Sequence, residues 1–105
     1  MTKTIRSLLA LAAVISLAGA VGFAQSAGEA TYKAKCQMCH GAAGTPSAGM
    51  AKSMGIKAVS DPDIKKLTAD QMFAAVKNGK GKMKPIAGLT DAQIKDVVAF
   101  YRSLK

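Results

Sequence analysis

The sequence predicts an all-α fold, a single domain built from three or four short helices. Beyond the N-terminal segment, no run of alternating β-branched residues indicates a strand. Two segments, which begin at Thr68 and Thr90, read T-x-x-Q, so the threonine can cap a helix while the glutamine reaches back to it. Near the C-terminus, apolar residues recur at spacings of three and four, which gives a helix one face for burial.

Residues 1–24 have the pattern of a secretory signal. Two positive charges precede an apolar run, and small residues at Gly22 and Ala24 suit a cleavage site. Cleavage after Ala24 would leave residues 25–105 as the single domain of an exported protein. An uncleaved membrane anchor is the alternative, because the apolar run approaches spanning length and no further charge appears before Glu29. We favour removal, because glycine and alanine dilute the hydrophobicity toward the end of the run.

The composition limits what the remaining domain can be. The full chain has a net charge of +9, no tryptophan and only 5% aromatic residues. The chain stays strongly basic without Lys3 and Arg6. A positive net charge of this size favours solubility and binding to acidic partners, but it does not predict a fold. Nucleic acid is not expected as a partner, because the chain shows neither a recognition-helix pattern nor an aromatic stacking motif. So short a domain with few aromatic residues usually needs a staple such as a disulfide, a metal or a cofactor.

The first two helices of the domain are predicted mainly from the loop residues and the proline at their ends. One helix is expected from Gly28 to Cys39, followed by a loop of small residues and proline from Gly41 to Gly49. A shorter helix is expected to begin at Asp61, with Pro62 in its first turn, where a missing amide donor does no harm.

The two later helices begin at the T-x-x-Q segments. The helix from Thr68 is expected to end at Asn78-Gly79, a favourable stop. The helix from Thr90 has an apolar stripe made of Ile94, Val97, Val98, Tyr101 and Leu104. No linker or second domain remains in the chain after these assignments.

The only two cysteines and the only histidine lie within five residues, Cys36-Gln37-Met38-Cys39-His40. On a helical turn Cys36, Cys39 and His40 share one face, because they are at positions i, i+3 and i+4. Two thiols can add to the two vinyl groups of a haem (heme), while the neighbouring imidazole meets the iron. C-x-x-C-H is the attachment signature of c-type haem.

Other interpretations of this motif are less favoured. A zinc site needs further cysteine or histidine ligands, which the chain does not have. A thioredoxin-like redox pair expects a βαβ context, and a disulfide between Cys36 and Cys39 would close too small a loop to restrict the unfolded chain. A cationic helical interaction module without haem also remains open at this point.

Haem iron bound by the histidine needs a sixth ligand, for which methionine is the natural choice. Met38 points away from the shared face, and Met72 follows a predicted helix start, where core packing is more plausible. Met50 and Met54 lie one turn apart if their segment is helical, and apolar filling is favoured over ligation for both. Met83 stands in a loop rich in glycine and lysine, where an apolar side chain has no evident core role.

These residues resemble class I cytochrome c, and most closely its short bacterial monohaem forms. The resemblance covers essentially all of Gly28 to Leu104. Gly28 and Tyr32 match the glycine and the aromatic residue that precede the first cysteine by eight and four residues in the family. Val97 and Phe100 match positions of its last helix, which the first helix crosses.

The resemblance implies a cytochrome c fold, with the helices wrapped around one covalently attached haem c. Carried over residue by residue, it implies that Cys36 and Cys39 hold the haem, that His40 is the proximal iron ligand and that Met83 is the distal one. One departure is that Lys84 separates Met83 from the proline that commonly follows it directly in the family. The family also has a loop carbonyl that accepts the N–H of the proximal histidine, and the sequence does not assign it, although Pro46 could supply it.

The implied function is that of a periplasmic single-electron carrier rather than an enzyme. Thioether sulfur stabilises ferrous iron, so His/Met ligation raises the reduction potential and leaves no position open to oxygen or peroxide. Burial of the macrocycle would raise the potential further and supply the missing core. The residues expected to cover the macrocycle are Tyr32, Met72, Phe73, Val97 and Tyr101. The alternative is a haem peroxidase or gas-binding protein, in which Met83 does not bind the iron.

Four lysines flank the expected distal ligand, and we refer to them as the lysine rim: Lys77, Lys80, Lys82 and Lys84. A solvated loop would explain them equally well by charge alone. Their place beside the haem edge favours docking of acidic redox partner proteins, such as membrane electron-transfer complexes or a terminal oxidase or reductase. The protein is expected to be a monomer that touches the membrane only transiently, unless the signal segment is retained.

Overall fold

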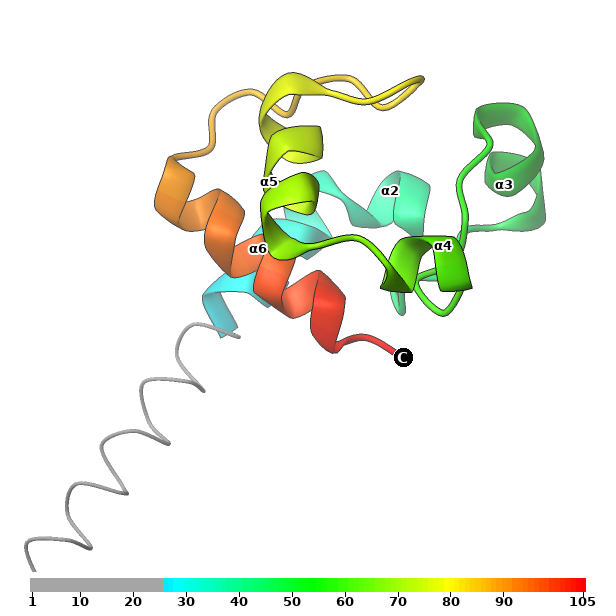
Figure 1. Cartoon of the computed structure of the whole chain (residues 1–105), viewed down its shortest axis with the longest axis horizontal. Helices are drawn as coiled ribbons and strands as arrows, with labels where there is room; N and C mark the ends of the chain where they lie inside the picture. Colours follow the sequence, from blue (N-terminus) through cyan, green and yellow to red (C-terminus); the bar gives the residue numbers. More distant parts are fainter. Residues whose placement is uncertain (1–25) are drawn as a thin grey trace, which may run out of the picture.

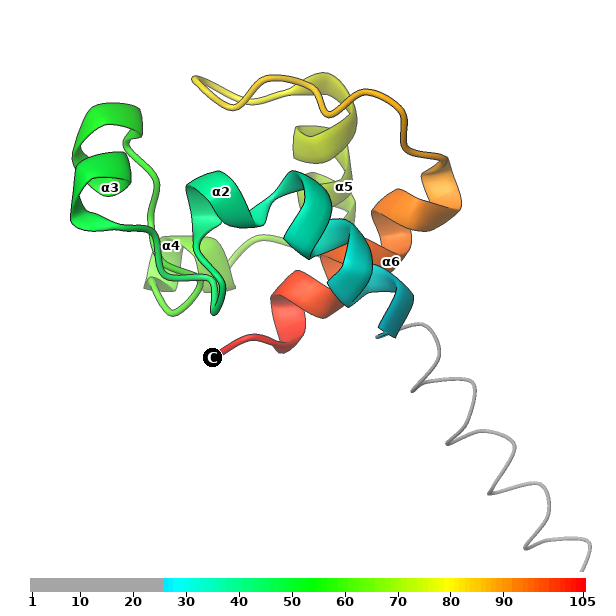
Figure 2. The ribbon, with the colours of Figure 1, turned by 180° about the vertical axis from the view of Figure 1, so that it is seen from behind.

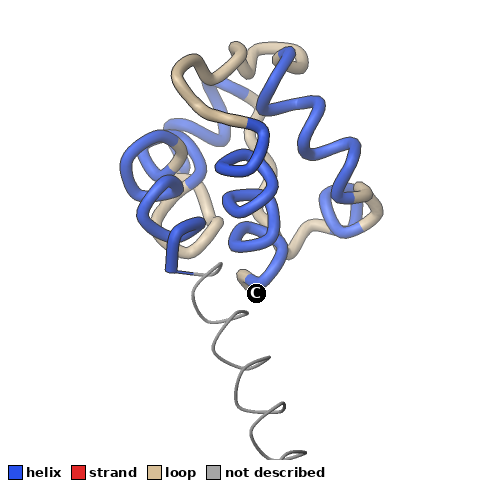
Figure 3. The backbone as a smooth tube through the Cα atoms, turned by 90° about the vertical axis from the view of Figure 1, so that its left-hand side faces the viewer, coloured by secondary structure: helices blue, strands red, loops and turns tan. Residues whose placement is uncertain are grey.

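The computed structural model describes residues 26–105, and the predicted signal segment lies outside the described residues (Figure 1). Residues 26–35 form a helix. The helices after it are α2 (Gln37–His40), α3 (Ala48–Met54), α4 (Pro62–Lys65), α5 (Ala69–Asn78) and α6 (Asp91–Ser103). Figure 3 shows only helices and loops in this part of the chain, where β pairing is limited to an isolated bridge between Lys80 and Met83. The predicted all-α fold is confirmed.

The helix starts that the sequence predicts are present. Thr68 accepts from the backbone N–H of Gln71 at 3.1 Å, and the Gln71 side chain accepts from the Thr68 N–H at 2.9 Å. Thr90 and Gln93 form the same reciprocal pair at the start of α6. Such caps satisfy amide groups that the first turn leaves free, and each contributes about 1 kcal/mol. At α4, Asp61 caps the helix and a proline occupies the first turn, also as expected.

Two features differ from the expected elements. The first helix does not run unbroken to Cys39: it is interrupted at Cys36, whose φ of −119° departs from helical geometry, and α2 begins after it. The segment of Met50 and Met54 is a helix, α3, capped by Ser47 and ended by Gly55 at a φ of +67°. Residues 26–105 therefore contain more helices than the three or four predicted. The break at Cys36 divides the first helix into two, and α3 is an additional short helix.

The first helix crosses α6, as Figure 2 shows, and Gly28 lies where the two helices touch. A Cβ atom added at Gly28 would overlap the carbonyl of Asp96 and lie 2.9 Å from the Cβ of Phe100. One turn later, Tyr32 is only 1% exposed, with its ring centroid 5.3 Å from that of Phe100. The expected close approach of these two helices is therefore confirmed.

Helices α5 and α6 pack against each other and provide the hydrophobic core. The core cluster consists of Met72, Val76, Ile94 and Val98. Val97, on α6, is also buried. Phe73, Tyr101 and the leucines that precede the two helices are partly buried against the cluster. The apolar stripe predicted for the last helix is thus the face that α6 buries, with its final members only partly covered.

In space, helix α3 lies on the far side of the domain from the α5–α6 pair, and α2 lies between them (Figures 1 and 2). No residue of α3 or of α2 is fully buried. The loop after α5 extends over α2 toward α3 in both views. Among residues 26–105, no helix combines the length and apolar character needed to span a membrane.

Candidate haem site

Helix α2 presents the cysteines and the histidine on a single turn. The Cys36 N–H donates to the Tyr32 carbonyl at 2.9 Å, and the His40 N–H donates to the Cys36 carbonyl at 3.0 Å. Cys36, Cys39 and His40 are all half-buried, whereas Met38 between them is 86% exposed. The turn therefore keeps the two thiols and the imidazole partly covered and leaves Met38 in water, although Gln37 is half-buried as well.

The two thiols are free and do not form a disulfide. Burial and the neighbouring Cys39 raise the pKa of the Cys36 thiol, so it stays protonated at neutral pH. Within residues 26–105, no three His, Cys, Asp or Glu side chains are gathered closely enough to hold a metal ion. This geometry suits haem better than zinc, because haem receives the thiols at its edge and the imidazole at its centre, so the three groups need not converge.

The surroundings of His40 favour its neutral form. Burial lowers the pKa of its imidazole, and the uncharged form is the one that binds metals. Its Nδ1 atom is buried and has no hydrogen-bond partner among the described residues, so the carbonyl of Pro46 does not accept from it. The ring of Tyr101 meets the imidazole edge-on, with centroids 5.6 Å apart. An unpaired buried ring nitrogen is a cost that a bound partner would remove.

Tyr32 joins the first helix to the end of α2. Its hydroxyl donates to the carbonyl of Gly41, the residue after the motif, at 2.6 Å. Its ring stacks on that of Tyr101 at 6.1 Å between centroids, and Tyr101 in turn contacts His40. Burial raises the pKa of Tyr32 to about 12. The sequence placed Tyr32 at the helix crossing but missed this hydrogen bond, although a buried tyrosine hydroxyl generally requires a partner.

Met83 lies in a tight turn after α5. Lys80 and Met83 exchange two backbone hydrogen bonds, at 2.9 Å and 3.0 Å. The turn is entered at Gly79, whose φ is +82° and where a Cβ would press on Pro85 and on the Met83 carbonyl. The Met83 side chain is partly buried against the core cluster. This packing has no signal in the sequence, although Met83 is not itself one of the buried core residues.

The other methionines occupy different surroundings. Met72 is 8% exposed and belongs to the core cluster, as expected. Met50 and Met54 are on α3, where the first is half-buried and the second 37% exposed, and neither packs against the core cluster. Met83 is thus a methionine that faces the interior from a loop without being one of the buried core residues.

The lysine rim is exposed along its whole length, but its members are not equivalent. Lys77 pairs with Asp91 at 2.9 Å and lies over the ring of Phe73. Lys82 donates to the backbone carbonyl of Ser53 at 3.0 Å. Because Lys77 is paired with a carboxylate, the positive field near Met83 comes mainly from the other three members.

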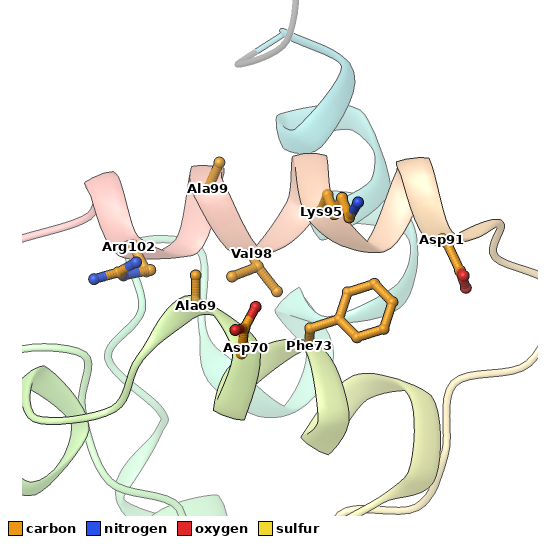
Figure 4. A pocket seen from close by; sticks show the side chains of 8 residues that line it. All are labelled: Ala69, Asp70, Phe73, Asp91, Lys95, Val98, Ala99 and Arg102. Atoms are coloured by element: carbon orange, nitrogen blue, oxygen red, sulfur yellow. The ribbon is translucent and has the colours of Figure 1, made fainter.

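An open groove of about 530 Å³ lies between α5 and α6 (Figure 4). It is lined by both acidic and basic side chains around Phe73 and Val98, and neither Cys36, Cys39, His40 nor Met83 contributes to it. The groove is therefore not the predicted haem site.

The donor set fits a covalently bound haem, and comparison with known proteins agrees. Residues 23–100 match the family described as cytochrome C oxidase, cbb3-type, subunit III, which covers most of the chain. The chain belongs to this cytochrome c family. The chain also resembles the solved structure of the KustC0563 c-type cytochrome, with a TM-score of 0.66 and 25% sequence identity. The match covers 74% of this chain and 96% of the KustC0563 chain. None of the curated proteins compared with the cytochrome matches it.

The resemblance to small monohaem cytochromes c is thereby confirmed, and the cofactor of the cytochrome is haem c with its iron. The general role of the domain is electron transfer. The individual roles of Cys36, Cys39, His40 and Met83 stay predictions, supported by the geometry described above.

Proposed function

We propose that the cytochrome is a periplasmic single-electron carrier whose haem c is bonded to Cys36 and Cys39 and ligated by His40 and Met83. The observation that carries the proposal is the α2 turn, which presents two free, half-buried thiols beside a neutral imidazole with an unpaired buried nitrogen. Met83 also supports it, because its side chain is partly buried against the core cluster and comes from a turn closed by two hydrogen bonds.

When bound, haem c supplies a one-electron iron couple. The residues of the chain would hold and insulate it. Cys36 and Cys39 would fix its position through thioethers, and the imidazole of His40 would bind the iron in its neutral form. The Met83 thioether would favour the ferrous state and exclude diatomic ligands from the sixth position. Tyr32 would keep the end of the motif in place through its hydrogen bond to Gly41.

Location and partners belong to the same proposal. Residues 1–24 would direct export and then be removed, which leaves the domain free in the periplasm. The exposed lysine rim beside Met83 would attract acidic faces of redox proteins. The family description names an oxidase, so a terminal oxidase or another membrane electron-transfer complex is a suitable class of partner.

Replacement of the distal ligand tests the proposal. Met83→Ala should leave haem covalently bound but open its iron, so that the reduced protein takes up carbon monoxide readily at neutral pH. Met54→Ala is the matched control, because it removes a thioether from α3 outside the core cluster, and it should leave the visible spectrum nearly unchanged. A spectrum altered by Met54→Ala but not by Met83→Ala would reverse the ligand assignment.

The mass of the protein purified from the periplasm tests the remaining parts. We expect the mass of residues 25–105 plus one haem, and loss of the haem when both cysteines are replaced by serine. A colourless protein after maturation would contradict the cofactor attachment, and a mass that includes residues 1–24 would contradict cleavage.

A further inference from the structure

Helix α3 has few contacts that hold it to the rest of the molecule. None of its residues is fully buried, and its N-terminal cap is supplied by its own neighbour, Ser47. It ends at Gly55, where a Cβ atom would have no neighbour within 4 Å. A seven-residue helix without buried residues depends on whatever polar contacts reach it, because short helices are marginal alone.

One such contact comes from the loop after α5. The Lys82 ammonium donates to the carbonyl of Ser53 at 3.0 Å, and 29 residues separate the two along the chain. Ser53 lies in the last turn of α3, where carbonyl groups lack partners within the helix. A positive charge is favourable there because the C-terminal end of a helix carries partial negative charge. We call this contact the Lys82 tether.

The tether is placed next to the expected distal ligand. Lys82 precedes Met83 in the turn closed by the two hydrogen bonds between Lys80 and Met83. The other hydrogen bond that restrains this loop, from the Ile86 N–H to the Val76 carbonyl at 2.9 Å, ties it to α5. The tether therefore ties the same turn to α3, so the turn is held from two sides.

We propose that Lys82 is a positioning residue for Met83, which acts through its hydrogen bond to Ser53. The inference rests on the proposed function, in which Met83 binds the haem iron. With the tether in place, the turn and α3 stay together and Met83 keeps its orientation toward the interior. Without it, no side-chain hydrogen bond within the described residues joins the turn to α3, and Met83 leaves the iron more often.

The lysine rim offers matched controls. Lys80 and Lys84 carry the same charge on the same loop and make no side-chain hydrogen bond within the described residues. Lys80→Ala therefore removes equal charge without removing the tether. Lys82→Arg retains a donor of similar length and should preserve the contact.

The first measurement uses the haem-loaded protein and follows carbon monoxide uptake by its reduced form. Uptake requires departure of the distal ligand, so its rate reports how often Met83 leaves. We expect Lys82→Ala to raise the rate by roughly three- to tenfold, the range for the net loss of one solvent-exposed hydrogen bond. Lys80→Ala should leave the rate unchanged, and Lys82→Arg should restore it. Equal rates in the Lys82→Ala and Lys80→Ala proteins would overturn the proposal.

Hydrogen exchange of the backbone amides of α3 is the second measurement. We expect faster exchange in α3 for Lys82→Ala than for Lys80→Ala. Unchanged exchange would show that the tether does not hold α3 and would overturn the proposal. Faster exchange with unchanged carbon monoxide uptake would show that the tether holds α3 without positioning Met83, which also overturns it. Failure of the proposed function looks different, because Met83→Ala itself would then leave the spectrum and the uptake unaltered.

Discussion

At the scale of single residues, Tyr32 connects three parts of the site. Its ring fills the crossing between the first helix and α6, and its hydroxyl holds the Gly41 carbonyl at the end of α2. Through Tyr101 it is also linked to the imidazole of His40. A single side chain thus couples the helix crossing to the orientation of the expected proximal ligand.

Tyr32→Phe should destabilise the protein by about 1–3 kcal/mol at neutral pH, because the Gly41 carbonyl loses its donor. The pKa of Tyr32 is raised from 10.0 to about 12 in the folded state, so its protonated form stabilises the fold fully below pH 10. As the pH rises from 10 toward 12, the unfolded chain ionises first, and this contribution falls by roughly 2 kcal/mol. Denaturant unfolding across this pH range should show a steeper loss for the natural protein than for the variant.

Tyr101→Phe is the control for this prediction. Tyr101 is half-buried and makes no side-chain hydrogen bond within residues 26–105, so its loss should change stability at neutral pH much less. Parallel stability curves for Tyr32→Phe and the natural protein above pH 10 would contradict the prediction.

The site residues that could be predicted from the sequence are those whose arrangement depends only on their neighbours in the chain. Cys36, Cys39 and His40 are adjacent in the chain, so their arrangement follows from one helical turn. The packing of Met83 against the core and the bond from Lys82 to Ser53 join segments far apart in sequence. Neither has a signal in the residues themselves, because a lysine or a methionine in a loop is compatible with many contacts.

At the scale of elements, the sequence was most informative where a helix carries its own start and stop signals. α5 and α6 begin at the predicted threonines, since a capping box is made within four residues. The break at Cys36 was not predictable, because the segment from Gly28 to Cys39 contains no proline and its glycine lies at the start. α3, delimited by Ser47 and Gly55, was left open by the sequence because its seven residues are too few for a clear periodic pattern.

The crossing of the first helix and α6 depends on the absence of a side chain at Gly28. Gly28→Ala should destabilise the protein by about 1–3 kcal/mol, because the added carbon overlaps the Asp96 carbonyl, which is backbone and cannot move aside easily. Gly49→Ala is the matched control: Gly49 is also helical, nothing lies within 4 Å of the added carbon, and the change should be neutral or slightly stabilising. Thermal unfolding of both variants measures the difference, and equal melting temperatures would contradict it.

At the scale of the whole molecule, charge is unevenly compensated. The chain carries a net charge of +9, and the three ion pairs found within residues 26–105 include one member of the lysine rim, Lys77. The rim members nearest Met83 have no carboxylate partner there. An anionic redox partner would therefore meet a positive surface beside the expected distal ligand.

Oxidation of the reduced cytochrome by hexacyanoferrate(III), an anionic one-electron acceptor, should depend on this surface. Lys80→Glu combined with Lys84→Glu should slow the reaction several-fold at low ionic strength, because the charges act over a screening length of about 30 Å at 0.01 M salt. At 1 M salt the length falls to about 3 Å, and the difference should largely vanish. Stopped-flow kinetics at both salt concentrations measures the effect.

The control places the same charge change elsewhere. Lys65→Glu combined with Lys66→Glu alters α4 and its C-cap, which Figure 1 shows far from the loop after α5. If this pair slows the reaction as much as the rim pair does, the effect belongs to net charge and not to docking at the rim.

Because α3 buries none of its residues, core packing does not fix its length. Residues added or removed between Ser47 and Gly55 would change the outline of one end of the molecule while the α5–α6 pair stayed as it is. This end of the molecule could receive such changes, or a grafted peptide, at little cost to folding, provided that Ser53 keeps its contact with Lys82.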